Sequence, residues 1–278
     1  MNIKNIVMSD IDRFLDEDLG NEGDITSESL FTDEYVKAHI IAKQDCIIAG
    51  VDEISDVFNK TGAKTQLKVN NGDSVKSGTI IALVSGTALS ILKGERLAIN
   101  IIGRMSGIAT ETKKLLDICK SINPNVTVAA TRKTTPGFRK YEKKAVVIGG
   151  GETHRFGLYD AVMIKDNHIK IIGSVEKAIM KIKERVKNKI IEVEVENEKD
   201  ALTAAKLNVD VIMLDNFDPI NGEKVAKKIR QINKKILIEI SGGVNSGNIS
   251  KYAAFADRIS LGYITHSIKS IDFSLEII

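Results

Sequence analysis

The sequence predicts a mixed α/β protein whose C-terminal half alternates parallel strands with helices. From residue 126 onward, short apolar runs rich in β-branched residues are separated by segments of helical periodicity. This alternation is typical of βα units with right-handed crossovers. A polar residue or a glycine follows every run. Because parallel strands end at the same edge of a sheet, we expect these following residues to gather at one edge.

The first hundred residues have a different rhythm. Residues 9–20 carry apolar residues on one helical face, and residues 35–50 predict two short strands. The run "LKVNNGDSVKSGTIIALVSG" (67–86) alternates apolar and polar residues around an Asn-Gly turn, which predicts a hairpin. Lipoyl and biotinyl carriers use such hairpins with a lysine at the tip. The tip here is "NNGD", which favours a structural role.

Residues 87–122 predict a helical segment, with Gly103 and Gly107 as possible breaks. The apolar runs of the second half follow it, at 126–130, 160–164, 190–196, 210–214, 236–240 and 257–261. An incomplete β/α barrel and an open doubly wound sheet both fit this order. Each would place its ligand at the carboxyl ends of the strands.

The charge balance excludes a protein that binds nucleic acid over its whole surface. Lys and Arg total 40 against 37 Asp and Glu, a net charge of +3 over 278 residues. The local excess of cations in residues 130–169 therefore indicates a site for a small anion. Cys46 and Cys119 lie far apart without metal-ligand spacing. With no signal peptide and no apolar run long enough to span a membrane, we expect a cytoplasmic protein without a membrane partner.

Cations recur at consecutive predicted strand ends. Arg132 and Lys133 follow one strand, His154 and Arg155 follow the bend in "GGGETHR", and Lys165 ends the next strand. Each alone would be interpreted as a solvated charge or an ordinary histidine. Their recurrence predicts a site for a ligand with several anionic groups, because arginine forks bind carboxylates and lysines suit phosphates. The run Lys140, Lys143 and Lys144 is instead interpreted as a solvated helix face.

Acidic residues stand on the two strands that follow. In "EVEVE", Glu192, Glu194 and Glu196 point to one side of a strand, and Asp215 closes the next strand. Glutamates facing a barrel lumen are costly unless they meet cations or a metal. Glu194 and Asp215 suit Mg²⁺ or a developing positive charge. Simple neutralisation of the cations is the competing interpretation, chiefly for Glu192 and Glu196.

Two glycine-containing turns predict phosphate-binding loops. Ser241, Gly242 and Gly243 follow one strand and precede a predicted helix, and Gly262 does the same after the next strand. Backbone N–H groups at such turns bind phosphate, often at the late strands of a barrel.

The sequence resembles the quinolinate phosphoribosyltransferases over nearly its whole length. The resemblance rests on "GDIT" (23–26), "GERLAINIIGRMSGIAT" (94–110), "TRKTTPGFR" (131–139), "GGGETHRFGLYDAVMIKDNHI" (149–169), "EVEVEN" (192–197), "IMLDNF" (212–217), "EISGGV" (239–244) and "SLGYITHS" (260–267). It implies an N-terminal α/β sandwich domain over 1–105 and an incomplete β/α barrel over 106–266. The tail 267–278 would pack back on the first domain.

The same resemblance implies the reaction and the roles of the site residues. The family transfers the phosphoribosyl group of phosphoribosyl pyrophosphate to quinolinate with decarboxylation, giving nicotinate mononucleotide, pyrophosphate and CO₂ for NAD biosynthesis. Arg132, His154, Arg155 and Lys165 would hold the two carboxylates of quinolinate. Phosphoribosyl pyrophosphate and its Mg²⁺ would bind Lys133, Glu194, Asp215, Ser241, Gly242, Gly243 and Gly262, with Lys133, Lys165, Glu194 and Asp215 counted as catalytic.

The resemblance also implies a homodimer or higher oligomer in which Arg96, in "GER", is donated across the interface. The middle of "GGGETHR" differs from the His-Asn pair expected in many relatives, and Glu152 brings a negative charge near the site.

Three other functions compete with this prediction. Molybdenum-associated proteins of the same fold share part of the pattern, although "TRKTTPG" and "HRFGLYDAVMIKDNHI" argue against them. A Schiff-base aldolase would use Lys165. An RNA-binding module would use residues 132–144, and the low net charge and the few aromatics argue against it.

Overall fold

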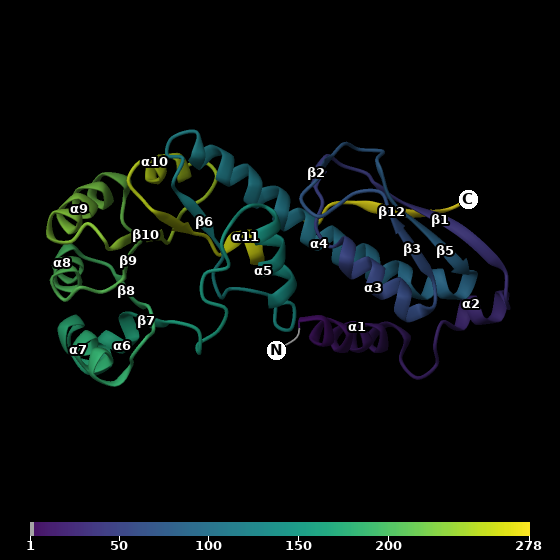
Figure 1. Cartoon of the computed structure of the whole chain (residues 1–278), viewed down its shortest axis with the longest axis horizontal. Helices are drawn as coiled ribbons and strands as arrows, with labels where there is room; N and C mark the ends of the chain where they lie inside the picture. Colours follow the sequence, from purple (N-terminus) through teal and green to yellow (C-terminus); the bar gives the residue numbers. More distant parts are fainter. Residues whose placement is uncertain (1–2) are drawn as a thin grey trace. The chain divides into compact units, whose positions relative to one another are not determined.

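The computed structural model describes residues 3–278, with side chains from Asp10 onward. The chain forms two compact units (Figure 1). The first comprises the chain up to Glu111, together with Lys140–Gly149 and Ile268–Ile278; the second comprises Thr112–Arg139 and Gly150–Ser267. The domain limits predicted at residues 105 and 266 stay a prediction, because a continuous helix crosses the first of them.

The first unit is built on a four-stranded antiparallel sheet. Its strand order is β12-β1-β5-β3, and its strands are β1 (Tyr35–Ala42), β3 (Lys64–Leu67), β5 (Ile80–Thr87) and β12 (Phe273–Ile277). The short strands β2 (Cys46–Ile47) and β4 (Ser74–Val75) pair separately. The helices of this unit are α1 (Ile3–Leu19), α2 (Ile25–Leu30), α3 (Val51–Thr61), the first part of α4 (Ala88–Lys120) and most of α5 (Arg139–Ile148).

The hairpin predicted over residues 67–86 forms only in part. After Gly72, which has φ +95°, the chain enters β4, and β4 pairs with β2. Strand β5 pairs instead with β3, which ends at Leu67, and with β1. The period-2 pattern identified the strands, but partner choice depends on residues far along the chain.

Helix α4 runs without a break through both glycines that were predicted to interrupt it. A Cβ on Gly103 would lie 2.8 Å from the Ile271 carbonyl oxygen, and a Cβ on Gly107 would lie 2.4 Å from that of Lys269. Ile271 N–H also donates a hydrogen bond to the Gly103 carbonyl. These glycines therefore allow the C-terminal segment to pass against the helix before β12 pairs with β1.

The second unit contains a six-stranded parallel sheet of strand order β6-β11-β10-β9-β8-β7. Its strands are β6 (Thr127–Ala129), β7 (Val162–Ile164), β8 (Ile191–Val195), β9 (Val211–Asp215), β10 (Leu237–Ser241) and β11 (Arg258–Ser260). Strands β7 to β11 follow one another in chain order, and β6, the first strand, pairs with β11, the last. Only a sheet that curls toward closure has this order, so the predicted incomplete barrel is confirmed and the doubly wound alternative is wrong.

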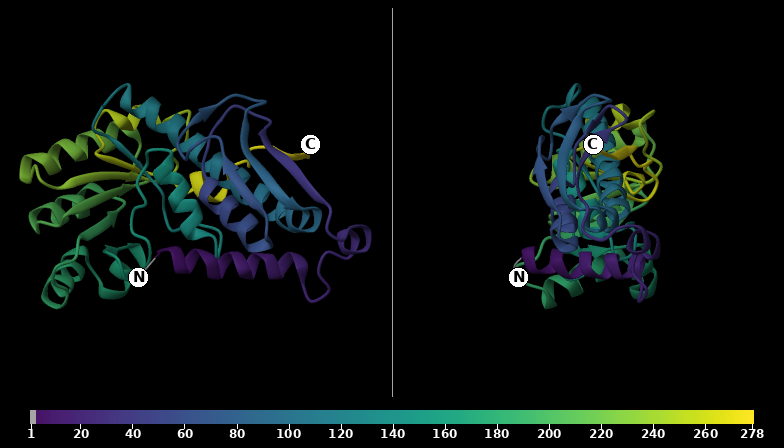
Figure 2. Two further views of the ribbon diagram at one scale, coloured as in Figure 1. Left: turned by 45° about the vertical axis from the view of Figure 1, so that its right-hand side comes forward. Right: turned by 90° about the vertical axis from the view of Figure 1, so that its right-hand side faces the viewer.

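Helices alternate with these strands along the chain. They are α6 (Asp166–Ile172), α7 (Val175–Arg185), α8 (Glu198–Lys206), α9 (Pro219–Ile232), α10 (Ile249–Ala253) and α11 (Tyr263–His266). Helices α7, α8 and α9 lie side by side along the strands (Figure 2). Val193, Ile212 and Ile238 are fully buried. Among the described residues, no helix has the combined length and apolarity needed to cross a bilayer.

Candidate active site

A cavity of about 560 Å³ opens at the carboxyl ends of the barrel strands. Eleven of the twelve predicted site residues line it: Arg132, Lys133, His154, Arg155, Lys165, Glu194, Asp215, Ser241, Gly242, Gly243 and Gly262. Nine of them lie on the six strands or in the segments that directly follow them, and His154 and Arg155 lie in the segment between α5 and β7. The twelfth, Arg96, lies exposed on α4 in the first unit and does not line this cavity.

Two arginines form the most cationic part of the cavity. The Nε atom of Arg132 is buried and has no hydrogen-bond partner among the described residues. Burial lowers the pKa of Arg155, and the nearby charge of Arg132 lowers it further. Like charges brought together and a buried donor without a partner are both unfavourable, so this part of the cavity is arranged for an anion.

Lys165 forms an ion pair with Glu194 at the end of β7 and β8. The backbone N–H of Lys165 also donates to His168 Nδ1 at 2.9 Å, which fixes the start of α6. The lysine of a Schiff-base aldolase must be free to attack a carbonyl, whereas Lys165 is engaged by a carboxylate. The structure therefore disfavours the Schiff-base aldolase.

Glu194 and Asp215 suit the metal predicted for them in chemistry and in position. Both line the cavity and supply the hard oxygen ligands that Mg²⁺ prefers. The Glu194 contact with Lys165 uses Oε2, and Asp215 Oδ2 accepts a hydrogen bond from Asn216 Nδ2 at 2.7 Å. Each of these two contacts therefore involves only one of the two oxygens of its carboxylate.

The turn after β10 requires glycine. Gly242 and Gly243 have φ values of +82° and +63°, and a Cβ on Gly242 would lie 2.3 Å from Asn216 Oδ1. Asn216 is itself in the left-handed region and donates its N–H to the Ser241 carbonyl at 2.9 Å. The backbone of this turn therefore packs against the end of β9.

Gly262 also makes room for a predicted site residue. A Cβ at this position would lie 2.9 Å from Cδ of Lys133. The buried Thr265, in helix α11, donates a hydrogen bond from its hydroxyl to the Lys133 carbonyl at 2.8 Å. The loop that carries Lys133 is thus held by residues next to Gly262.

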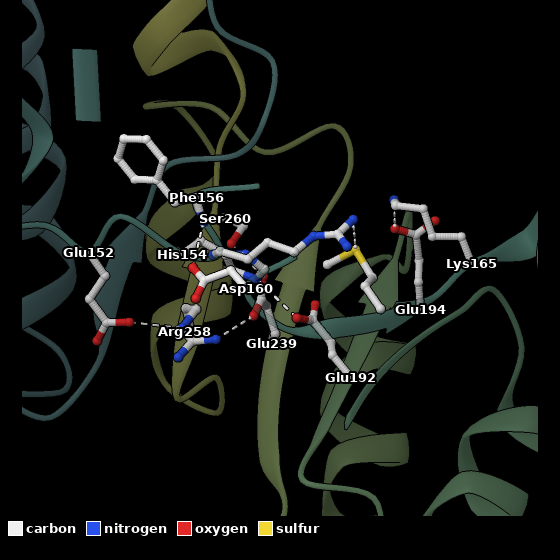
Figure 3. A network of polar contacts seen from close by, with 12 residues as sticks. Glu152, His154, Phe156, Asp160, Lys165, Glu192, Glu194, Glu239, Arg258 and Ser260 are labelled. Carbon is white, nitrogen blue, oxygen red and sulfur yellow. Dashed lines mark hydrogen bonds and ion pairs between the residues drawn. The ribbon is translucent and has the colours of Figure 1, made fainter. Parts of the chain in front are cut away.

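His154 lies between two buried glutamates at the floor of the cavity (Figure 3). Its Nε2 is 3.1 Å from Glu192 Oε2 and 3.3 Å from Glu239 Oε1. Its Nδ1 accepts a hydrogen bond from the Arg155 N–H at 2.7 Å. Both ring nitrogens therefore face protein atoms.

The contacts of His154 favour two different protonation states. Burial lowers its pKa, but the carboxylates of Glu192 and Glu239 favour the cation strongly enough to raise the pKa to about 9. A cationic ring would carry a proton on Nδ1, where the Arg155 N–H already donates. We assign the neutral ring with its proton on Nε2, because only an unprotonated Nδ1 can accept that 2.7 Å hydrogen bond.

The sequence did not identify Glu239 and Arg258, which complete this floor. Glu239 is fully buried and accepts a hydrogen bond from Arg258 Nη1 at 3.0 Å. Arg258 Nε donates at 3.0 Å to Glu152. The charge of Glu152, expected to alter the site, is therefore paired with Arg258, and Glu152 does not line the cavity. The available signal was a single glutamate inside the apolar run "ILIEI".

The three glutamates of "EVEVE" have three different environments. Glu192 is buried beside His154, Glu194 lines the cavity, and Glu196 lies exposed beyond the end of β8. The cavity is also lined by residues that sequence reasoning did not single out, namely Met163, Met213, Tyr263 and His266.

The interpretation of the lysine run as a solvated helix face is wrong. Lys143 is fully buried, Lys140 pairs with Asp10, and Lys144 pairs with both Asp52 and Glu53. These lysines belong to the first unit, whereas Arg132 and Lys133 belong to the second. The RNA-binding alternative needs them as one exposed basic surface, so it loses its support.

Comparisons with known proteins agree with this architecture. The family model "Quinolinate phosphoribosyl transferase, N-terminal domain" matches residues 24–106, and the corresponding C-terminal domain model matches residues 108–276. A probable nicotinate-nucleotide pyrophosphorylase [carboxylating] of Archaeoglobus fulgidus is 45% identical over 92% of this chain and 98% of its own length.

Two further relatives extend the match. The mitochondrial quinolinate phosphoribosyltransferase [decarboxylating] 2b of Nicotiana tabacum is 37% identical over 95% of this chain and 80% of its own length. The solved structure of the nicotinate-nucleotide pyrophosphorylase from Francisella tularensis superposes with a TM-score of 0.93 at 35% identity, covering 100% of this chain and 98% of that one. The chain therefore belongs to the quinolinate phosphoribosyltransferase family.

Proposed function

We propose that this protein transfers the phosphoribosyl group of phosphoribosyl pyrophosphate to quinolinate, releasing pyrophosphate and CO₂ and forming nicotinate mononucleotide for de novo NAD biosynthesis. The observation that carries the proposal is the convergence of Arg132, Arg155, Lys133 and Lys165 in one cavity with the two glycine turns. Both substrates are polyanions, and family membership supports the same reaction.

The arginines are proposed to bind quinolinate. The buried Nε of Arg132 and the guanidinium of Arg155 would donate to its carboxylates, and Lys165 would add a third positive charge. Lys133 and the turns at Ser241–Gly243 and Gly262 would hold the phosphates. These contacts would bring the pyridine nitrogen and the ribose C1 together, so that positioning supplies much of the catalysis.

The transfer step exchanges one bond at C1 for another. The pyridine nitrogen donates its electron pair to C1, and the C1–O bond to pyrophosphate breaks with its electron pair leaving on oxygen. The ribosyl group is oxocarbenium-like at the midpoint, and the carboxylates of Glu194 and Asp215 would stabilise that positive charge. Cationic side chains near the phosphates would stabilise the departing pyrophosphate.

Decarboxylation then needs no strong base. The ring nitrogen is positively charged after transfer, so it stabilises the electron pair left on the adjacent carbon when that carboxylate departs as CO₂. A proton from water replaces the lost group.

Mg²⁺ is proposed to bind with phosphoribosyl pyrophosphate through Glu194 and Asp215. When bound, it would supply positive charge to the pyrophosphate oxygens. Its support is the oxygen donor set on two neighbouring strands described above.

We further propose a homodimer or higher oligomer in which Arg96 of one copy enters the cavity of another. The support is that Arg96 is an exposed arginine that its own cavity does not use. A cytoplasmic location is proposed because Cys46 and Cys119 are both buried and unpaired, as expected where thiols stay reduced.

The test is a product assay with the purified protein, quinolinate, phosphoribosyl pyrophosphate and Mg²⁺. Nicotinate mononucleotide and CO₂ are expected in equal amounts. With nicotinate in place of quinolinate, no product is expected, because one carboxylate is missing. Chelation of Mg²⁺ should stop turnover, and adding excess Mg²⁺ afterwards should restore it. No product from quinolinate would overturn the proposal.

A further inference from the structure

Glu239 sits below the cavity and takes no direct part in lining it. Its side chain is fully buried on β10, yet it contacts three groups. Oε2 accepts a hydrogen bond from Arg258 Nη1 at 3.0 Å, while Oε1 accepts one from the Ser260 hydroxyl and faces His154 Nε2 at 3.3 Å. A buried carboxylate with this many partners is held in one orientation.

The charge of Glu239 is well compensated. Burial would raise its pKa, but His154, Arg258 and Ser260 together hold the pKa below its ordinary value. Its charged partner, Arg258, is itself paired with Glu152.

His154 is held at both ends of its ring. The residue has φ +51°, a conformation uncommon for any residue but glycine. Its Nδ1 accepts the Arg155 N–H, and its Nε2 faces the two buried carboxylates. The orientation of the ring thus constrains the position of the Arg155 backbone N–H. Backbone conformations of this kind persist where the surroundings enforce them, and they cluster at functional sites.

The same three side chains could in principle hold a metal ion. One ligand atom from each of His154, Glu192 and Glu239 lies within 4.8 Å of the others. A metal would need a lone pair on Nε2, and the Arg155 N–H already requires one on Nδ1. A ring with both lone pairs free is an imidazolate, which is far less stable than the neutral ring with a proton on Nε2. His154 Nε2 therefore makes close contacts with the two carboxylates, at 3.1 and 3.3 Å, that lack hydrogen-bond geometry, and the cluster is not a metal site.

We propose that Glu239 is a positioning residue that fixes the tautomer and orientation of His154, and through it the placement of Arg155 for the carboxylates of quinolinate. The inference rests on the proposed function for the identity of the ligand. Glu239 does not touch substrate and acts only through His154. Arg258 and Ser260 hold Glu239 in the required orientation.

The first test is Glu239→Gln in the full chain. An amide at this position replaces one oxygen acceptor by an N–H donor, which repels either Arg258 or the Nε2 proton of His154. We expect the KM for quinolinate to rise about tenfold, as for loss of a hydrogen bond to a charged group. The KM for phosphoribosyl pyrophosphate should stay unchanged. The matched control is Glu198→Gln, whose carboxylate pairs with Lys228 at the surface of the same unit.

A double-mutant cycle with His154→Asn separates positioning from general damage. If Glu239 acts through His154, then Glu239→Gln should have no further effect on quinolinate KM in the His154→Asn background. Additive effects of the two changes would overturn the proposal. An unchanged quinolinate KM in Glu239→Gln alone would overturn it as well.

Imidazole ¹⁵N NMR provides a readout that does not depend on turnover. The chain has four histidines, so the signals of His154 are identified by their loss in His154→Asn. The expected wild-type pattern is a neutral ring protonated on Nε2, and Glu239→Gln should shift it. A cationic ring, or signals unaffected by Glu239→Gln, would contradict the assignment. If wild type is inactive but this pattern is found, the proposed reaction is wrong and the His154–Glu239 arrangement remains.

Ser260→Ala is the replacement test if circular dichroism shows that Glu239→Gln does not fold. This change removes only the hydroxyl that donates to Glu239 Oε1. A smaller rise in quinolinate KM and a shift of the His154 signals are expected. Normal kinetics together with unshifted signals in this variant would refute the proposal.

Discussion

Lys165 and Glu194 form an ion pair at the carboxyl ends of the neighbouring strands β7 and β8. The pair joins a cation assigned to one substrate with a carboxylate assigned to the other. The side chain of Lys165 is 39% exposed and that of Glu194 only 13%, so the lysine is the more accessible partner. Binding of a polyanion would compete with Glu194 for the ammonium group and free an oxygen for Mg²⁺.

Glu194→Gln tests the metal assignment. Loss of the negative charge should lower kcat/KM about 10- to 100-fold and raise the Mg²⁺ concentration needed for half-maximal rate. Initial rates over a Mg²⁺ titration measure both. Glu196→Gln is the control, because Glu196 belongs to the same motif but lies exposed beyond the strand. Equal Mg²⁺ dependence in the two variants would remove Glu194 from the metal site.

Arg132→Ala tests the carboxylate site. The buried Nε without a partner should bind substrate, so its removal should raise the KM for quinolinate about 10- to 100-fold. Circular dichroism should show an intact fold, since Arg132 lies in a loop after β6. Arg185→Ala, at the exposed end of α7, is the control for loss of an arginine. Normal turnover of Arg132→Ala would defeat the assignment.

Gly107→Ala tests the close approach of the C-terminal segment. Alanine in a helix interior ordinarily stabilises by up to about 1 kcal/mol relative to glycine. Here the Cβ would lie 2.4 Å from the Lys269 carbonyl oxygen, so we expect a loss of about 1–3 kcal/mol in the free energy of unfolding. Urea denaturation measures it. Asn100→Ala, on the exposed side of the same helix, should not destabilise; a gain of stability in Gly107→Ala would contradict the packing.

The two cysteines should be unreactive in the folded protein. Burial raises the pKa of Cys46 to about 11, with a further contribution from Asp45, and burial raises the pKa of Cys119 to about 11. Because the folded pKa exceeds the ordinary value of 9.0, forming either thiolate opposes folding as pH rises from 9 toward 11. An aromatic disulfide reagent at pH 8 should label neither thiol until denaturant is added. Rapid labelling of the native protein would show that these thiols are accessible.

Wild-type protein should form no borohydride-trapped adduct with a carbonyl compound. Lys165 is engaged in an ion pair with Glu194, so we do not expect it to attack a carbonyl. Mass spectrometry of protein treated with pyruvate and borohydride measures the outcome. Lys165→Met is the control for modification of the other lysines. An adduct lost specifically in Lys165→Met would restore the aldolase alternative.

The sequence by itself determined the strands of the barrel and the rim of the cavity. The β-branched composition and the spacing of the apolar runs mark each strand. Because parallel strands end at a common edge, the residues at their carboxyl ends gather there, as Arg132, Lys165 and Asp215 do. The glycines after β10 are likewise local, since positive φ at Gly242 depends on the turn itself. Resemblance of whole motifs then identified the family.

Only the tertiary structure decided what lies beneath that rim. Glu239 and Arg258 are one glutamate and one arginine in unrelated runs, and their pairing with each other beside His154 depends on the register of β10 and β11. The pairing of Lys144 with Glu53 and the passage of the tail over Gly107 likewise join residues far apart in the chain. Such contacts arise from packing between elements, and no local periodicity encodes which distant residue completes a buried charge.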